Sequence, residues 1–223
     1  MTKAVVLLSG GMDSTTLLHD VIRRRGAREV CALSFFYGQK HRRELEAARW
    51  QARAAGVREH LVVDLSFFGE LVRGKSALTD PALDILPLAD LPVSDRNQPP
   101  TYVPNRNMIL LSLAAAFAES RGIRDVFYGA QTQDRYGYWD CTAGFLERIN
   151  AALALNRKGA VTIHAPFIGM RKAEELKLGF ELGVDYAHTW TCYRGGEAPC
   201  GVCPACEERA GAFREVGLRD PLG

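Results

Sequence analysis

Apolar and polar positions follow two patterns along the chain. Short continuous apolar runs, which suit strands buried on both faces, occur at residues 4–8, 30–36, 61–65, 125–129 and 161–166. Between them, apolar residues recur every three or four positions, which predicts helices over residues 14–25, 42–55, 107–120, 145–155 and 172–182. This alternation is typical of an α/β protein with a parallel sheet.

Two segments depart from these patterns. Over residues 66–101 the periodicity gives way to Pro, Asp and Leu, so we expect an irregular, partly mobile stretch, with a lid over a ligand as one interpretation. From Thr191 onward, cysteines accumulate. We therefore expect a main domain over residues 1–190 and a small metal-binding segment over residues 191–223.

Composition narrows the class of protein. The 223 residues are 47% hydrophobic and 24% charged, as in soluble globular proteins, and no apolar run approaches the ~18 residues of a membrane span. The first apolar run is short and lacks a cleavage site, so it fits a strand better than a signal peptide, and we expect a cytoplasmic protein. With 28 basic and 26 acidic residues the net charge is +2, which argues against a nucleic-acid partner.

The turn after the first apolar run has the features of an anion site. The candidate residues are Leu8, Ser9, Gly10, Gly11, Met12, Asp13, Ser14, Thr15 and Thr16. Adjacent glycines let the backbone turn sharply and present N–H groups, and the next helix adds its positive dipole end and hydroxyl donors. A carboxylate there is repulsive unless it handles a cation, so Asp13 is a candidate Mg²⁺ ligand beside a nucleotide phosphate. The alternative is a plain helix cap by Asp13 or Ser14.

Four of the six cysteines, Cys192, Cys200, Cys203 and Cys206, lie within 15 residues of one another. Four thiolates can close a tetrahedral zinc site and leave no position for substrate, so we expect one structural zinc per chain. A disulfide or free core cysteines are the alternatives, and both suit a cytosolic chain poorly. A zinc-bearing nucleic-acid reader is disfavoured by the acidic residues around the cluster. Cys31 reads as a core residue, and Cys141 lies in a polar loop.

Three further polar stretches follow predicted strands or precede a helix, at residues 37–41, 103–107 and 131–141. Loops at the carboxyl edge of an open α/β sheet commonly bind ligands. Aromatic rings beside carboxylates suit a planar heterocycle, and the candidates are Tyr37, Gln39, His41, Arg106, Asp134, Tyr138 and Asp140. For each stretch alone, a loop with capping Asn or Asp is an equally good interpretation.

These motifs carry a family resemblance. Residues 9–14 look like the Ser-Gly-Gly-x-Asp-Ser loop of the ATP pyrophosphatase (PP-loop) superfamily. Together with residues 37–41, 104–107, 138–141, 172–174 and 191–193 and the later cysteines, they resemble, in order, the 7-cyano-7-deazaguanine synthase family. The matching segments span nearly the whole chain, and the full set is much more specific than the nucleotide loop.

The resemblance implies a Rossmann-like adenine-nucleotide fold and an ATP-dependent carbon–nitrogen ligase of queuosine precursor biosynthesis. Such enzymes convert 7-carboxy-7-deazaguanine and ammonia into the 7-cyano base through an adenylate and an amide, and they are often homodimers. The implied roles are Asp13 for Mg²⁺, Lys172 for the transferred phosphates and His41 as a general base or positioning group. Asp140 and Asp134 would bind a second metal or the N–H edge of the base.

Some residues depart from the family pattern. The family usually has proline at Trp139, arginine at Thr142 and a different run at residues 130–133. Three alternatives therefore stay open. One is that the chain is a relative that couples the same or a similar acid to another amine. The others are that the product is the amide, and that the released nucleotide is AMP or ADP. A tRNA-modifying PP-loop enzyme would need a reactive cysteine, for which Cys141 is the candidate, and a broad basic surface. A non-enzymatic zinc-bearing module would leave the glycine loop unexplained.

Overall fold

A parallel five-stranded sheet organises the chain, and the computed structural model describes residues 3–92, 99–131 and 138–223. The strands run in the order β3 (Glu59–Asp64), β2 (Val30–Phe36), β1 (Ala4–Leu7), β4 (Asp125–Phe127) and β5 (Thr162–His164). Every pairing is parallel. The predicted α/β class is confirmed, although β4 and β5 are shorter than their apolar runs.

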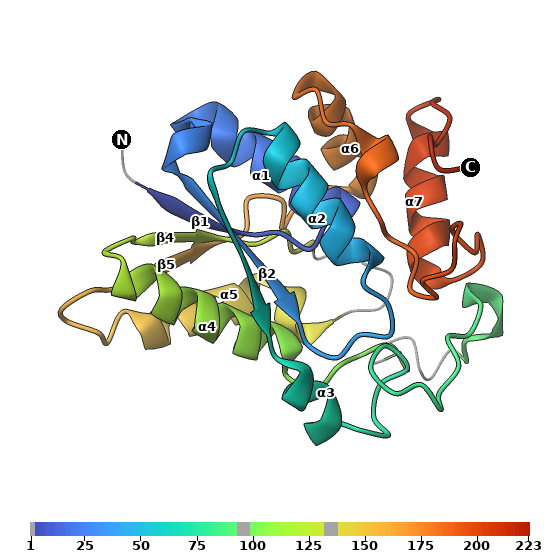
Figure 1. The fold of residues 1–223 in the computed structure, drawn as a ribbon, viewed down its shortest axis with the longest axis horizontal. Coiled ribbons are helices and arrows are strands. Elements are labelled where there is room, and N and C mark those ends of the chain that lie inside the picture. Colours follow the sequence, from blue (N-terminus) through green and yellow to red (C-terminus); the bar gives the residue numbers. More distant parts are fainter. Residues whose placement is uncertain (1–2, 93–98, 132–137) are drawn as a thin grey trace.

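Helices cover both faces of the sheet (Figure 1). On one face lie α1 (Met12–Arg25) and α2 (Arg43–Ala54), and on the other α4 (Arg106–Ser120) and α5 (Ala143–Leu153). Alternate residues of β1 supply the two cores: Val5 packs with the α4 side, and Ala4 and Val6 pack with the α1 side. A buried parallel strand needs apolar residues on both faces, which explains the continuous apolar runs.

Two more helices extend the α1 side. Helix α6 (Lys172–Glu181) packs against α1, and α7 (Pro204–Glu215) packs against α6. Pro204 occupies the start of α7, where its missing N–H costs nothing. In the described part of the chain, no helix combines the length and the apolar character that crossing a membrane requires.

The stretch over residues 66–101 is more ordered in secondary structure than expected. It begins with the short helix α3 (Ser66–Leu71) and contains the 3₁₀ turn η2 (Leu88–Asp90). Phe68 and Leu78 are buried in the core on the α4 side, so apolar anchors rather than periodicity fix this segment. Residues 93–98 lie outside the described residues.

Helix α1 begins two residues earlier than the pattern predicts. Its N-cap is Gly11, which has no side chain to cap with, and Asp13 already lies in the first turn. The interpretation of Asp13 or Ser14 as a plain helix cap is therefore wrong. Both side chains are left for other contacts.

Candidate active site

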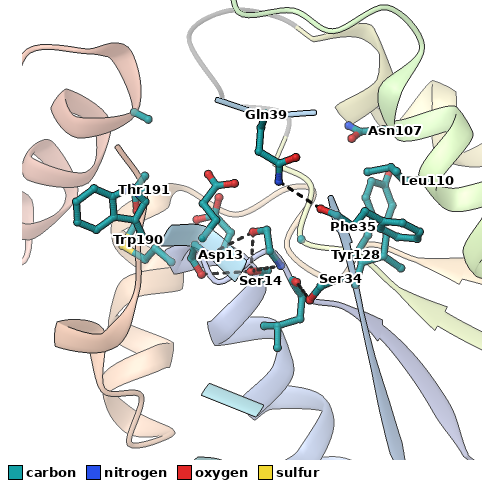
Figure 2. Close-up of a pocket in the computed structure, with 18 of the residues that line it drawn as sticks. Asp13, Ser14, Ser34, Phe35, Gln39, Asn107, Leu110, Tyr128, Trp190 and Thr191 are labelled. Atoms are coloured by element: carbon teal, nitrogen blue, oxygen red, sulfur yellow. Dashed lines mark hydrogen bonds between the residues drawn. The ribbon is translucent and has the colours of Figure 1, made fainter. Parts of the chain in front are cut away.

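A cavity of about 270 Å³ opens at the carboxyl edge of β1 and β2. Figure 2 shows Asp13 and Ser14 between two walls: Trp190 and Thr191 lie on one side, with Phe35, Leu110 and Tyr128 on the other. The wall residues come from parts of the chain far apart in sequence. A parallel sheet brings such loops together at one edge, where ligands bind in this class of fold.

The floor of the cavity is the glycine turn. Gly10 has a φ of 87°, and a Cβ there would collide with the backbone carbonyl of Glu44, so only glycine fits. The Ser14 hydroxyl accepts hydrogen bonds from the N–H groups of Ser9 (3.1 Å) and Gly10 (3.2 Å) and donates to the Gly11 carbonyl. The turn thus points its N–H groups inward around one hydroxyl, as an anion site requires.

Most, but not all, of the predicted loop residues reach the cavity. Those that line it are Leu8, Ser9, Gly11, Met12, Asp13 and Ser14. Gly10 shapes the turn from behind, and Thr15 and Thr16 are fully buried. The Thr16 hydroxyl donates to the Met12 carbonyl and bonds to the Tyr186 hydroxyl at 2.7 Å. These two threonines are therefore packing residues of α1 in this structure.

Asp13 and Lys172 meet across the cavity mouth. The Lys172 Nζ lies 2.7 Å and 2.8 Å from the two carboxylate oxygens of Asp13. They come together because α1 and α6, on whose first turns they lie, pack against each other. Both side chains are partly exposed, so the ion pair borders the open part of the cavity. A phosphate group bound there would lie beside these two charges.

The loop after β2 supplies Tyr37, Gln39 and His41 to the cavity. The Gln39 amide is engaged in holding the loop, since its oxygen accepts from the Tyr37 N–H (2.8 Å) and its nitrogen donates to the Phe35 carbonyl (3.3 Å). Nδ1 of His41 is buried and has no hydrogen-bond partner among the described residues. Burial lowers the pKa of His41, partly opposed by the nearby Cys192, which favours a neutral imidazole.

Arg106 opens α4 and points at the β2 loop. Its guanidinium lies 5.6 Å from the Tyr37 ring centroid and donates to the Tyr37 hydroxyl at 3.4 Å. Burial works against its charge, but Tyr37, Asp140, Tyr193 and Tyr138 outweigh that effect and raise the pKa of Arg106. Arg106 is thus a permanent positive charge in the cavity wall.

Of the two predicted carboxylates of the base loop, only Asp140 is among the described residues, and it does not line the cavity. Asp140 is 3% exposed, accepts a hydrogen bond from the Asn107 N–H (3.3 Å) and is not among the residues that line the cavity. Burial raises the pKa of Asp140, and Arg106 opposes the shift. Asp134 lies outside the described residues, whereas Tyr138 lines the cavity and bonds to the Thr101 hydroxyl (3.0 Å).

Several cavity residues were missed by the sequence analysis: Ser34, Glu44, Asn107, Tyr128, Trp190, Thr191, Tyr193, Glu208 and Arg209. Glu44 is the most informative of these residues. Burial raises the pKa of its carboxyl group to about 7, although Arg106 lies close enough to oppose the shift. A signal was available, since Glu44 lies one helical turn before Ala48 on the buried stripe of α2. The Tyr128 hydroxyl is buried and lacks a partner among the described residues, which marks it as a group that could face a ligand.

The four clustered cysteines are positioned for a metal ion. All four sulfur atoms lie within 4.8 Å of one another, and the sulfurs of Cys200 and Cys206 are 4.0 Å apart. Ligands of a tetrahedral zinc, with Zn–S bonds of about 2.3 Å, are separated by about 3.8 Å, so the cluster fits after small movements. Backbone N–H groups of Cys200 and Cys203 point at the sulfurs of Cys192 and Cys200, which favours thiolates.

The cysteine segment also builds part of the cavity. Cys192, Cys203 and Cys206 belong to the same buried cluster as the sheet residues Val5 and Leu33. The backbone N–H of Trp190, the residue just before the metal-binding segment, donates to the Gly10 carbonyl at 2.9 Å, and Thr191 and Tyr193 line the wall. The metal-binding segment thus begins next to the glycine turn and forms part of the cavity wall.

The parallel sheet, the glycine turn and the cavity at its carboxyl edge define an α/β protein with a ligand-type cavity built on a glycine turn. In fold, the chain is similar to an NMN synthetase from Francisella tularensis, with a TM-score of 0.52 and 13% identity over 97% of this chain and 78% of that one. The family described as "Queuosine biosynthesis protein QueC" matches residues 3–217, and the chain belongs to that family. The predicted family resemblance is confirmed.

Curated relatives agree with this assignment. A 7-cyano-7-deazaguanine synthase from Caldicellulosiruptor bescii is 46% identical over 99% of this chain and 96% of its own length. One from Archaeoglobus fulgidus is 47% identical over 99% of this chain and 89% of its own. The similarity therefore covers the glycine turn, the cavity walls and the cysteine cluster alike.

Proposed function

We propose that this chain converts 7-carboxy-7-deazaguanine and ammonia, with ATP, into 7-cyano-7-deazaguanine. The observation that carries the proposal is the single cavity that joins a glycine turn to a wall of Tyr37, Arg106 and Tyr193, in a chain 46% identical to a synthase of that name. The turn suits a nucleotide phosphate, and the wall suits a planar base.

The reaction would proceed by two activations. A carboxylate oxygen of the substrate attacks the α-phosphorus of ATP and pyrophosphate leaves. Ammonia then displaces AMP, loses a proton and gives the amide. The amide oxygen is activated by a second ATP in the same way, and departure of AMP with loss of the remaining N–H protons leaves the nitrile. The protein must hold the reacting oxygen in line with the phosphorus and stabilise the charge that develops.

Five side chains are proposed for this work. Lys172 would neutralise the transferred phosphates, which its Nζ can reach by leaving the Asp13 carboxylate. His41, neutral and with a free Nδ1 in the described structure, would accept the proton that the attacking amine loses. Asp13 and the Ser9 and Ser14 hydroxyls offer the oxygen ligands that Mg²⁺ prefers, and the bound ion would neutralise phosphate charge.

We further propose that the cysteine cluster holds one structural zinc ion, that the protein is a homodimer, and that it works in the cytoplasm. Four sulfur ligands would fill all four positions of a tetrahedral site and leave none for water, which favours a structural over a catalytic metal. A zinc-to-protein ratio near one by elemental analysis would support the metal, and sedimentation would give the oligomeric state.

The test of the activity is mass spectrometry of the products formed from 7-carboxy-7-deazaguanine, ammonia and ATP. We expect a base at the nitrile mass, with two nucleotides consumed for each. An amide that persists, or a conjugate with another amine, would replace this proposal by that of a relative with a different product. The nucleotide pool in the same experiment distinguishes AMP from ADP.

A further inference from the structure

Most polar groups of the cavity are already engaged with other parts of the protein. The Asp13 carboxylate pairs with Lys172, and the Gln39 amide is engaged at both ends in its own loop. The Ser34 hydroxyl donates to the Leu8 carbonyl and also bonds to His60. These groups hold the cavity in shape, so they leave little capacity to recognise the base.

Glu44 differs from them. It lines the cavity, and no described residue donates a hydrogen bond to its carboxylate. It lies close enough to Arg106 and Tyr37 for each to feel its charge, which places it beside the aromatic and basic wall. Its backbone carbonyl lies so close to Gly10 that the first turn of α2 packs directly against the glycine turn. A carboxylate with open acceptor positions therefore lies at the cavity, beside the aromatic and basic wall.

The chemistry of the proposed substrate gives this group a partner. A guanine-type base carries two neighbouring donors on one edge, the ring N1–H and the 2-amino group. The two oxygens of a carboxylate accept in parallel, at a spacing that matches these two donors. Hydrogen bonds to a charged acceptor are also stronger than hydrogen bonds between neutral groups. Asp140, which the sequence analysis favoured for this edge, is directed at the Asn107 N–H and is not part of the cavity lining.

We propose that Glu44 is the specificity-determining residue that accepts the N1–H and 2-amino donors of the base. This inference rests on the proposed function, because it takes the base to be a 7-deazaguanine. The bound base then directs its 7-carboxylate away from Glu44, since two carboxylates repel each other, and toward the Lys172 side of the cavity. Glu44 thus selects the base and also sets which end of it meets ATP.

The test compares two acids, 7-carboxy-7-deazaguanine and its analogue without the 2-amino group, on the full-length metal-loaded protein. We expect the wild type to prefer the guanine form by about 30-fold in kcat/KM, because the analogue leaves one acceptor unpaired. In Glu44→Gln the preference should fall below about 5-fold, mainly through KM, because the amide turns a donor toward the 2-amino group. Glu46→Gln, an exposed change on the same helix, should keep the wild-type preference.

The outcomes separate the two proposals. An equal loss on both acids in Glu44→Gln, or an unchanged preference, would overturn the role of Glu44 and leave the proposed function standing. A wild type that handles both acids within 3-fold of each other would overturn it as well, and this result does not depend on how well the variant folds. Binding of ATP without binding of either acid would overturn the proposed function itself. Calorimetric ATP binding by Glu44→Gln, expected within about 2-fold of wild type, reports that the cavity is intact.

Discussion

A side chain at Gly10 would be costly for two reasons. The positive φ of Gly10 strains any other residue, and an added Cβ would also strike the Glu44 carbonyl of α2. We expect Gly10→Ala to lower the free energy of unfolding by about 3 kcal/mol and to abolish ATP binding. Urea denaturation and calorimetry would measure the two effects.

Gly122 provides a control for this change. Its φ is 65°, also in the left-handed region, but nothing lies within 4 Å of the Cβ position. Gly122→Ala should cost only about 1 kcal/mol, the conformational part alone. Equal costs at the two sites would show that the close approach to α2 does not matter.

Lys172 is the residue that the proposed reaction assigns to the charge of the transferred phosphates. We expect Lys172→Ala to lower kcat by about a thousandfold, because a positive charge at the transferred phosphates is lost and Asp13 is left without its partner. Rapid-quench measurement of nucleotide release would show the loss. Lys177→Ala on the same helix should keep most of the activity, and full turnover by Lys172→Ala would contradict the assigned role.

Glu44 makes the stability of the free protein depend on pH. Its pKa is raised from 4.5 to about 7 in the folded state, so between these values the folded chain binds more protons than the unfolded chain. Stability due to this group is therefore present below pH 4.5 and is lost as the pH rises through about 7. Because the side chain is only partly buried, we expect a loss of about 1 kcal/mol relative to Glu44→Gln. Parallel urea curves for the two proteins at pH 5 and pH 8 would test this, and a constant difference would contradict it.

At the scale of elements, α7 is held by one buried arginine. Arg209 is 3% exposed, makes two bonds to the Asp220 carboxylate at 2.7 Å and 2.9 Å, and also donates to the Thr189 hydroxyl (2.7 Å) and the Tyr186 carbonyl (3.0 Å). These contacts tie the helix that carries Cys206 to the segment before the cysteines. The helix is thus fixed by polar contacts as well as by its apolar face.

We expect Arg209→Met to lower the free energy of unfolding by about 3 kcal/mol, because it leaves Asp220 buried and without its partner. Arg214→Met lies on the same helix but is exposed, so it should cost less than about 0.5 kcal/mol. Chemical denaturation would measure both variants. Similar small costs for the two would mean that α7 is held by its apolar contacts alone.

The order and type of the main elements could be predicted because buried parallel strands and amphipathic helices leave clear patterns. The glycine turn and the cysteine cluster were also local patterns in sequence. The cavity walls could not be predicted in the same way, since they depend on which loops meet in space. Glu44 looks like one more charge on an exposed helix, and Asp140 looks like a site residue although it is directed at the backbone of α4. Helix α3 was missed because it is too short for a periodic pattern.

Across the whole molecule, the cysteine segment and the cavity form one packed unit. The cysteines share a buried cluster with the sheet, and Thr191 and Tyr193 line the cavity. We expect removal of the metal with a thiol-reactive mercurial and chelator to weaken ATP binding by at least 10-fold and to lower the thermal midpoint. A single unfolding transition should persist, and added zinc should restore both properties.

Calorimetry on the metal-free and the reloaded protein would distinguish the possibilities. Metal-free protein that binds ATP with unchanged affinity would contradict the contact between the two parts. Two separate unfolding transitions would instead show that residues 1–190 and 191–223 fold independently.

Trp190 has a practical consequence, because its backbone N–H donates to the Gly10 carbonyl. Its indole is buried, with the Arg43 guanidinium 4.8 Å from the ring. The chain has three tryptophans, so Trp50→Phe together with Trp139→Phe would leave a single native fluorophore next to the glycine turn. A change in its emission on addition of ATP would then report binding at the turn without an added dye.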